Sequence, residues 1–166
     1  MNWLKILTLI LFSLLFTLLD VSFFSFIQIY GVTIISTFLI IISFSLLVDT
    51  KLAHHDLLIF QSSSLIMFSV LSSVPIWLLL IGFIIIPGVI VYLRENYVSY
   101  PSVFVVIAIF LLSNFIFEII LFLSSSQTNQ NIILPLLYFV FINTIVGFAI
   151  YQIAFYFQSH KPEIRL

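Results

Sequence analysis

The chain has 166 residues, of which 63% are hydrophobic and only 7% are charged, and its formal net charge is −1. Ordinary soluble domains carry ~25% charged residues, so this composition excludes a water-soluble surface. The charge balance offers no basic surface for nucleic acid, and the absence of cysteine excludes disulfides, thiolate metal ligands and cysteine nucleophiles. We therefore predict an all-α, polytopic membrane protein that forms a single domain over residues 1–166.

The first predicted span covers residues 6–27 and follows Lys5, so it looks like a secretory signal sequence. No small-x-small cleavage site follows the apolar stretch that ends at Asp20, and residues 21–30, VSFFSFIQIY, stay bulky. We therefore expect an uncleaved transmembrane helix. A second apolar span, residues 32–48, follows the turn signal at Gly31.

The run from Leu57 to Leu93 contains no charged residue and raises the question of one helix or two. One helix of this length would measure ~55 Å, whereas the hydrocarbon core is ~30 Å thick. Pro75 removes a helical hydrogen bond, and the serines just before it can satisfy the freed backbone groups. The run is therefore predicted to form spans 57–74 and 76–93, joined by an outer hairpin with Pro75 and Trp77.

Two further apolar segments, residues 103–123 and 132–157, complete a predicted bundle of six transmembrane helices. Turn signals in DTKLAHHD, RENYVSYPS and SSSQTNQN separate the later spans. The basic residues test this count, because bacterial membrane proteins collect them in cytoplasmic loops. Six spans put all of them on one side: Lys5, Lys51, Arg94, Lys161 and Arg165. We therefore expect a multi-pass protein of the bacterial cytoplasmic (inner) membrane with both termini in the cytoplasm.

Three polar residues inside the predicted spans form a candidate intramembrane site: Asp20, Asn114 and Glu118. Ionisable residues in a bilayer are costly, which makes them candidates for function. At ~1.5 Å per residue, both carboxyl groups fall in the outer part of the bilayer at similar depth. Asn114 shares a helical face with Glu118 and could bond to it. Alternatively, Asp20 only ends its helix at the headgroups, and Glu118 is a protonated residue in helix packing.

The sequence contains no pattern that predicts an enzyme, a metal site or a cofactor site. His54, His55 and Asp56 are consecutive, so on a helix they point in different directions, and no further ligand accompanies them. We expect these three residues to form a solvated turn. Glycine-rich phosphate loops and paired catalytic aspartates are also missing from the sequence.

Small hydroxyl residues line one face of the third predicted span, at Ser62, Ser69 and Ser73. In lipid, such a face lets another helix approach closely and share hydrogen bonds. We predict that it serves either packing within the bundle or contact with a partner. The sixth span carries a comparable stripe of Asn143, Gly147 and Tyr151.

The end of the third span, LIMFSVLSSVPIW, resembles the rod shape-determining MreD family, as does the layout of six spans over about 166 residues. In that family the third helix ends in a pattern like G-L-L-x-D-L-x-S-x-x-P-F-G. Ser72, Pro75 and the apolar Ile76 match in register. Two glycines and an aspartate of the pattern are replaced in this chain by Leu65, Trp77 and Ser69.

This resemblance implies a non-enzymatic membrane scaffold of the cell-shape and peptidoglycan-elongation machinery. It also implies MreC-like and other cell-wall elongation membrane proteins as partners, alongside the lipid bilayer. The family is similar in its bundle to the substrate-binding subunits of energy-coupling-factor transporters. The alternative function is therefore a small-solute-binding subunit, although such a pocket needs convergent polar groups, of which this chain has few.

Overall fold

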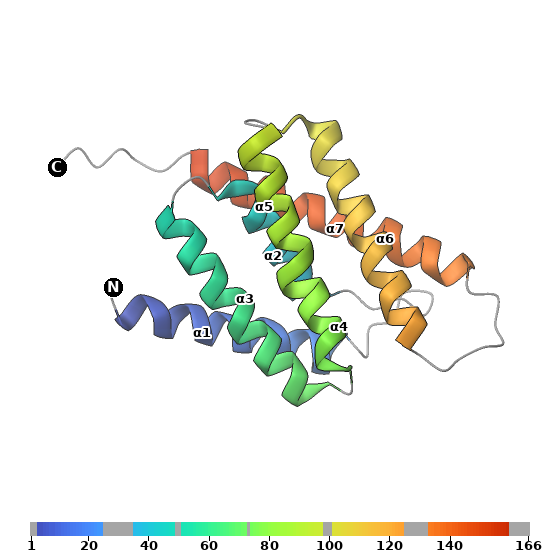
Figure 1. The fold of residues 1–166 in the computed structure, drawn as a ribbon, viewed down its shortest axis with the longest axis horizontal. Helices are drawn as coiled ribbons and strands as arrows, with labels where there is room; N and C mark the ends of the chain where they lie inside the picture. The colour runs from blue at the N-terminus through green and yellow to red at the C-terminus, as the bar shows by residue number, and fades with distance from the viewer. Residues whose placement is uncertain are drawn as a thin grey trace.

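A computed structural model describes residues 3–24, 35–48, 51–72, 74–97, 101–124 and 133–159, and the regular elements in these ranges are all helical (Figure 1). The first three helical regions are α1 (Trp3–Leu18) with its π-helical continuation η1 (Leu19–Phe24), α2 (Ser36–Leu47) and α3 (Lys51–Leu71). The others are the continuous rod of α4 (Ile76–Leu80), η2 (Ile81–Ile85) and α5 (Ile86–Tyr97), then α6 (Val103–Ser124) and α7 (Ile133–Ser159). The all-α prediction is confirmed.

Within the described residues, four helices are long and apolar enough to cross a membrane. They cover Trp3–Ser22, Ile76–Tyr97, Val103–Phe122 and Leu134–Ser159. The prediction of six spans is not confirmed on this criterion, because α2 has only 12 residues. At ~1.5 Å per residue, α2 is ~18 Å long, short of the ~30 Å core. The 21 residues of α3 are long enough, but this helix is less apolar than α1, α6 and α7.

The start of α3 differs from the prediction. The helix begins at Lys51 rather than at residue 57, so His54–Asp56 is helical and does not form a turn. His54 lies 3.0 Å from Glu95 at the end of α5, and Asp56 forms an ion pair with Lys5 of α1. These two contacts join three helices at one end of the bundle, and they supply the polar partners that allow the helix to extend.

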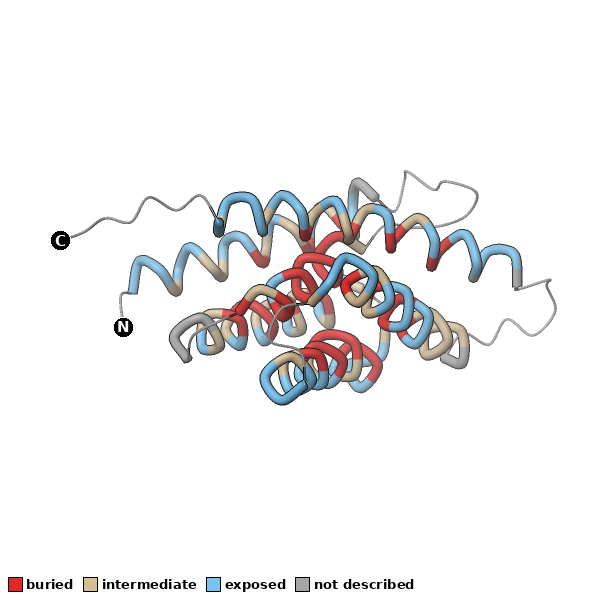
Figure 2. Tube along the Cα trace, turned by 90° about the horizontal axis from the view of Figure 1, so that it is seen from above, coloured by how far each residue is buried: buried red, intermediate tan, exposed pale blue. Residues whose placement is uncertain are grey.

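The short helix α2 lies at the centre of the molecule. Its residues are all buried except Phe44 and Leu47, and it packs against α1, α3, α5 and α7. A helix that is apolar on every side has no preferred solvent face, so other helices surround it. Figure 2 shows the buried stretches gathered where the helices face one another and the exposed stretches on the outside.

The predicted break at Pro75 is observed. The preceding helix ends at Leu71, and the backbone N–H groups of Leu78 and Leu79 donate to the Pro75 carbonyl as α4 begins. Ser72 satisfies the end of α3, because its hydroxyl donates to the Phe68 carbonyl at 2.7 Å. Two helices therefore replace the one long helix. Trp77, in the first turn of α4, is exposed.

Four phenylalanine rings, one from α2 and three from neighbouring helices, form a cluster in the core. Phe38 of α2 stacks on Phe117 of α6 at 4.4 Å between ring centroids, and Phe83 of η2 packs edge-on against Phe38 at 6.3 Å. Phe68 of α3 completes the cluster, with its ring 5.3 Å from Phe83. Aromatic pairs in such geometries contribute beyond the area they bury. This cluster joins α2, α3, η2 and α6.

The ion pairs Lys5–Asp56 and His54–Glu95 lie at one end of the bundle. Besides these pairs, Gln158 near the end of α7 donates to the Leu47 carbonyl at the end of α2, at 3.1 Å. We call this the charged end. The basic residues Lys161 and Arg165 lie outside the described residues.

Candidate functional site

Asp20 connects the first helical segment to the buried start of α2. Its carboxylate accepts the backbone N–H groups of Ser36 and Thr37, both at 2.8 Å, and the Ser36 hydroxyl at 2.5 Å. The Asp20 side chain is buried. An anionic group at a helix N-terminus satisfies unpaired N–H groups and interacts favourably with the helix dipole. Asp20 therefore supplies the cap that α2 lacks in its own sequence, because the residue before it, Ile35, has no capping side chain.

Asp20 lies in a π-helical turn that continues the first helix. This turn is η1, where the helix widens from α to π, and π turns inside helices are frequent at functional sites. Asn143 of α7 assists from the other side, since its Oδ1 accepts the Ile35 N–H at 3.3 Å. The N-terminus of α2 thus sits between two polar side chains inside the bundle. Non-helical backbone at membrane depth is tolerated only where protein surrounds it in this way.

The three residues of the predicted intramembrane site do not converge. Asn114 is buried and donates to Thr144 of α7 at 3.3 Å, so its expected bond to Glu118 is not formed. Glu118 is half-buried on α6, and within the described residues no hydrogen bond or ion pair involves its carboxyl group. The hydrogen bonds of Asp20 are to Ser36 and Thr37 instead. The prediction missed that pairing because Asp20 and Ser36 belong to different helices, and only tertiary structure brings them together.

The polar stripe of the last span faces inward. Asn143, Gly147 and Tyr151 are all buried. A Cβ added at Gly147 would lie 2.6 Å from the Phe110 ring and 3.2 Å from Leu39, so glycine allows α7 to approach α6 and α2 closely. This stripe therefore serves packing within the bundle.

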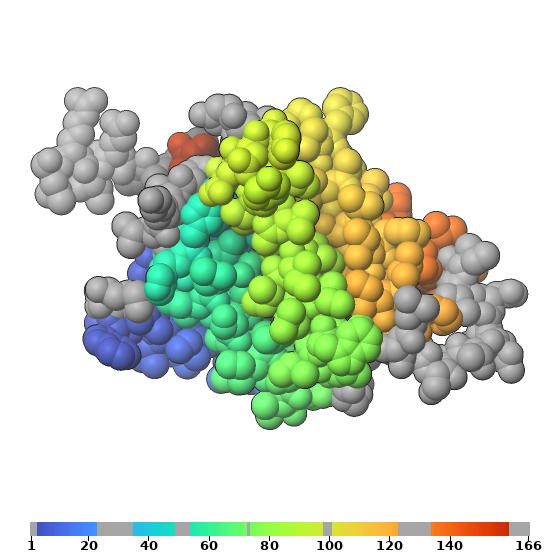
Figure 3. Space-filling view, in the orientation of Figure 1, coloured from blue at the N-terminus to red at the C-terminus, as the bar shows by residue number. Residues whose placement is uncertain are grey.

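The serines of α3 divide between the interior and the surface. Ser64 is buried, and its hydroxyl forms a hydrogen bond of 3.0 Å with the hydroxyl of Ser13 in α1. This contact lies where the two helices pack closely together. Ser62 is exposed, and Ser69 is half-buried and donates to the Ile66 carbonyl. Ser73 lies outside the described residues. In the space-filling view, α3 forms part of the surface between α1 and the α4–α5 rod (Figure 3).

The outward side of α3 is mainly apolar around Ser62. Leu58, Ile66 and Val70 share its helical face at intervals of four residues and are 55%, 57% and 76% exposed. We call these four residues the α3 face. The sequence indicated a serine stripe, but it did not distinguish the outward Ser62 from the inward Ser64.

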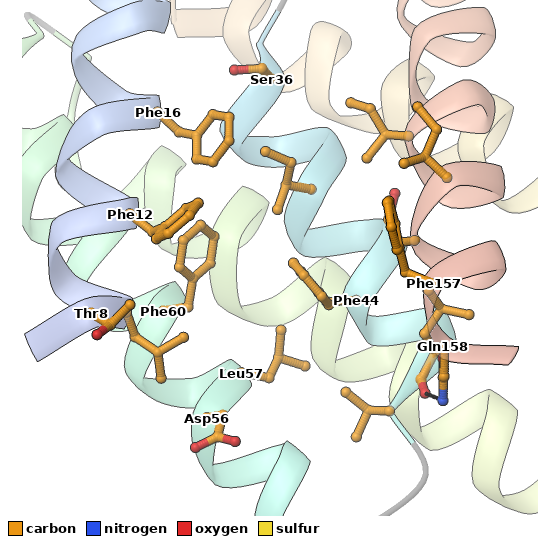
Figure 4. A pocket seen from close by; sticks show the side chains of 18 residues that line it. Thr8, Phe12, Phe16, Ser36, Phe44, Asp56, Leu57, Phe60, Phe157 and Gln158 are labelled. Carbon is orange, nitrogen blue, oxygen red and sulfur yellow. Dashed lines mark hydrogen bonds between the residues drawn. The ribbon is translucent and has the colours of Figure 1, made fainter. Parts of the chain in front are cut away.

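A cavity of about 810 Å³ lies over α2, between α1 and α7. Figure 4 shows Phe12 and Phe16 of α1 on one side, Phe157 and Gln158 of α7 on the other, and Phe44 of α2 between them. Apolar side chains make most of the lining, and polar ones lie mainly near its two ends: Ser36 at one, and Thr8, Asp56 and Gln158 at the other. The open side exposes large apolar side chains, among them Phe12, Phe44 and Phe157. We call this cavity the α1–α7 groove.

Comparisons with protein-family models, with curated proteins and with solved structures gave no match to this chain. Within the described residues no group of three or more His, Cys, Asp or Glu side chains is arranged to hold a metal ion. The described structure thus offers three features: the capped start of α2, the charged end and the α1–α7 groove.

Proposed function

We propose that this protein is a six-span, non-enzymatic scaffold of the bacterial inner membrane that holds partner helices of the cell-wall elongation machinery. In this proposal α2 and α3 complete the crossings begun by the four long apolar helices. The charged end faces the cytoplasm because basic residues prefer that side. The partners are MreC-like and other elongation proteins, as the resemblance to the MreD family implies.

The observation that carries this proposal is the α3 face. Ser62 is a polar residue exposed on the outside of a helix, and it lies among the exposed apolar side chains of Leu58 and Ile66. Such a serine gains little from lipid, but it lets a second helix approach closely and share a hydrogen bond. A partner helix on the α3 face would use both the small residue and its apolar neighbours.

The hydrogen bonds of the buried polar residues favour a scaffold that binds partner helices over a subunit that binds a small solute. Asp20 is engaged by α2, and Asn114 by Thr144, so these groups are not directed together at a ligand. A solute-binding subunit, the rival hypothesis, needs several polar groups that converge on one cavity. The α1–α7 groove has mainly apolar walls.

Co-purification from the host membrane tests the proposal. Wild-type protein should carry MreC-like or cell-wall synthase proteins, and Ser62→Phe or Ser69→Phe should weaken this association at equal membrane abundance. Ala108→Phe is the matched control, because Ala108 is exposed on α6, away from the α3 face. Absence of elongation proteins from the wild-type sample, together with specific retention of a small solute, would favour the solute-binding subunit.

A further inference from the structure

The α1–α7 groove is the feature that the scaffold role does not use. It joins four helices, since Phe12 comes from α1, Phe44 from α2, Phe60 from α3 and Phe157 from α7. Phe44 is one of only two α2 residues that are not buried, and it is 49% exposed because the groove opens above it. An apolar cavity of this kind does not hold ordered water. In a membrane, its open side admits hydrocarbon.

The length of the groove matches the acyl chains of a lipid. Its lining follows α2 from Ser36 to Val48, ~18 Å at 1.5 Å per residue, which is close to the ~15 Å thickness of one leaflet's hydrocarbon. Its volume of about 810 Å³ is within the range of small-molecule sites. Together with the mainly apolar walls, this length favours lipid chains as the occupant.

The charged end of the groove matches a zwitterionic headgroup. Asp56 lines the groove and pairs with Lys5, and their side chains remain 28% and 54% exposed. Thr8 and Gln158 lie at the same end. Trp3, next to this end on α1, is 84% exposed, as expected for an aromatic residue at the level of lipid headgroups. A lipid phosphate can therefore reach Lys5 while a lipid ammonium reaches Asp56.

We propose that the α1–α7 groove binds one phosphatidylethanolamine-type phospholipid, with its acyl chains along α2 and its headgroup at the Lys5–Asp56 pair. The proposal rests on the membrane location in the proposed function but not on the scaffold role. A lipid held there fills the space between α1 and α7 and completes the packing around α2.

Native mass spectrometry of the full-length protein, extracted in mild detergent from membranes with both phosphatidylethanolamine and phosphatidylglycerol, tests this site. Wild type should retain one phosphatidylethanolamine after washing. Ala154→Phe places a ring in the groove wall and should lower retention about tenfold. The matched control Ala108→Phe adds the same ring on α6 and should retain the lipid. If Ala154→Phe does not fold, Ile153→Trp at the exposed lip of the groove takes its place.

Asp56→Asn should remove the preference for phosphatidylethanolamine over phosphatidylglycerol while the groove still holds a lipid. The proposal is overturned if wild type retains no phospholipid or prefers phosphatidylglycerol. It is equally overturned if Ala154→Phe and Ala108→Phe lower lipid retention to the same extent. It is also overturned if groove filling displaces a partner protein and leaves lipid retention unchanged. Partner association is measured on the same samples. Lipid retention can therefore be judged even if no partner protein is found.

Discussion

The carboxylate of Asp20 accepts both the backbone N–H and the hydroxyl of Ser36, at 2.8 and 2.5 Å. This contact fixes where α2 begins, because it satisfies donors that a helix start inside a bundle would otherwise leave unpaired. The central helix is thus held by its covalent neighbours and by a side chain from η1. The rest of the fold packs around that fixed element.

Removing the Asp20 carboxylate should destabilise the protein strongly. Asp20→Leu leaves the N–H groups of Ser36 and Thr37 and the Ser36 hydroxyl without an acceptor. Each buried unpaired group costs ~1–3 kcal/mol, so the free energy of unfolding should fall by several kcal/mol. Asp20→Asn keeps one acceptor oxygen and should lose less. Thermal unfolding in detergent, followed by circular dichroism, ranks the stabilities of wild type, Asp20→Asn and Asp20→Leu. If Asp20→Leu is as stable as wild type, Asp20 does not stabilise the start of α2.

Glu118 is the control for Asp20, because it is a carboxyl group in an apolar helix that does not cap another helix. It is half-buried, and no hydrogen bond or ion pair joins its carboxyl group to the described part of the chain. Glu118→Gln and Glu118→Leu should therefore leave the unfolding temperature and membrane abundance near wild type, in contrast to the same changes at Asp20. Loss of partner association in Glu118→Gln at normal abundance would instead reveal a site that depends on its charge.

Gly82 should tolerate no side chain. A Cβ at this position would lie 2.3 Å from the Phe117 ring, and Phe117 is held by its stack on Phe38. Overpacking of this kind typically costs ~1–3 kcal/mol. Gly82→Ala should lower the unfolding temperature, whereas Gly88→Ala should not, because nothing lies within 4 Å of its added Cβ. Equal stability of the two variants would argue against the phenylalanine cluster.

Single cysteines can report the topology, since the natural chain contains none. Gln127→Cys should react with a membrane-impermeant thiol reagent in intact spheroplasts, and Thr50→Cys only after permeabilisation. Both positions belong to predicted loops outside the described residues. The reason for this expectation is that basic residues then share the cytoplasmic side. External labelling at residue 50, or protection at residue 127, would remove the six-span topology.

Much of the fold could be predicted from the sequence because apolar length and helix breakers are local properties. The break at Pro75 is one example, since proline acts through its own ring and missing N–H. The π turn at Ile81–Ile85 was not predicted, although Pro87 lies just after it and cannot donate a helical hydrogen bond. That proline, inside an apolar run, was the available signal.

The candidate site was harder to predict, because it depends on which helices are neighbours. Asp20 and Asn114 stand out in the sequence as polar residues in apolar spans, but their partners come from α2 and α7. Ser62 and Ser64 look alike in sequence, and only the packing of α3 on α1 turns one outward and the other inward. The groove likewise exists only in the assembled bundle.

Photo-crosslinking from position 62 tests the central claim, that the α3 face holds a partner helix. A benzophenone amino acid at Ser62 is compared, at equal expression, with the same group at exposed Ala108 of α6. Irradiation of intact membranes should join residue 62, and not residue 108, to an MreC-like or cell-wall synthase protein identified by mass spectrometry. Crosslinks to lipid alone from position 62, or equal yields of the same protein from both positions, would contradict the scaffold function.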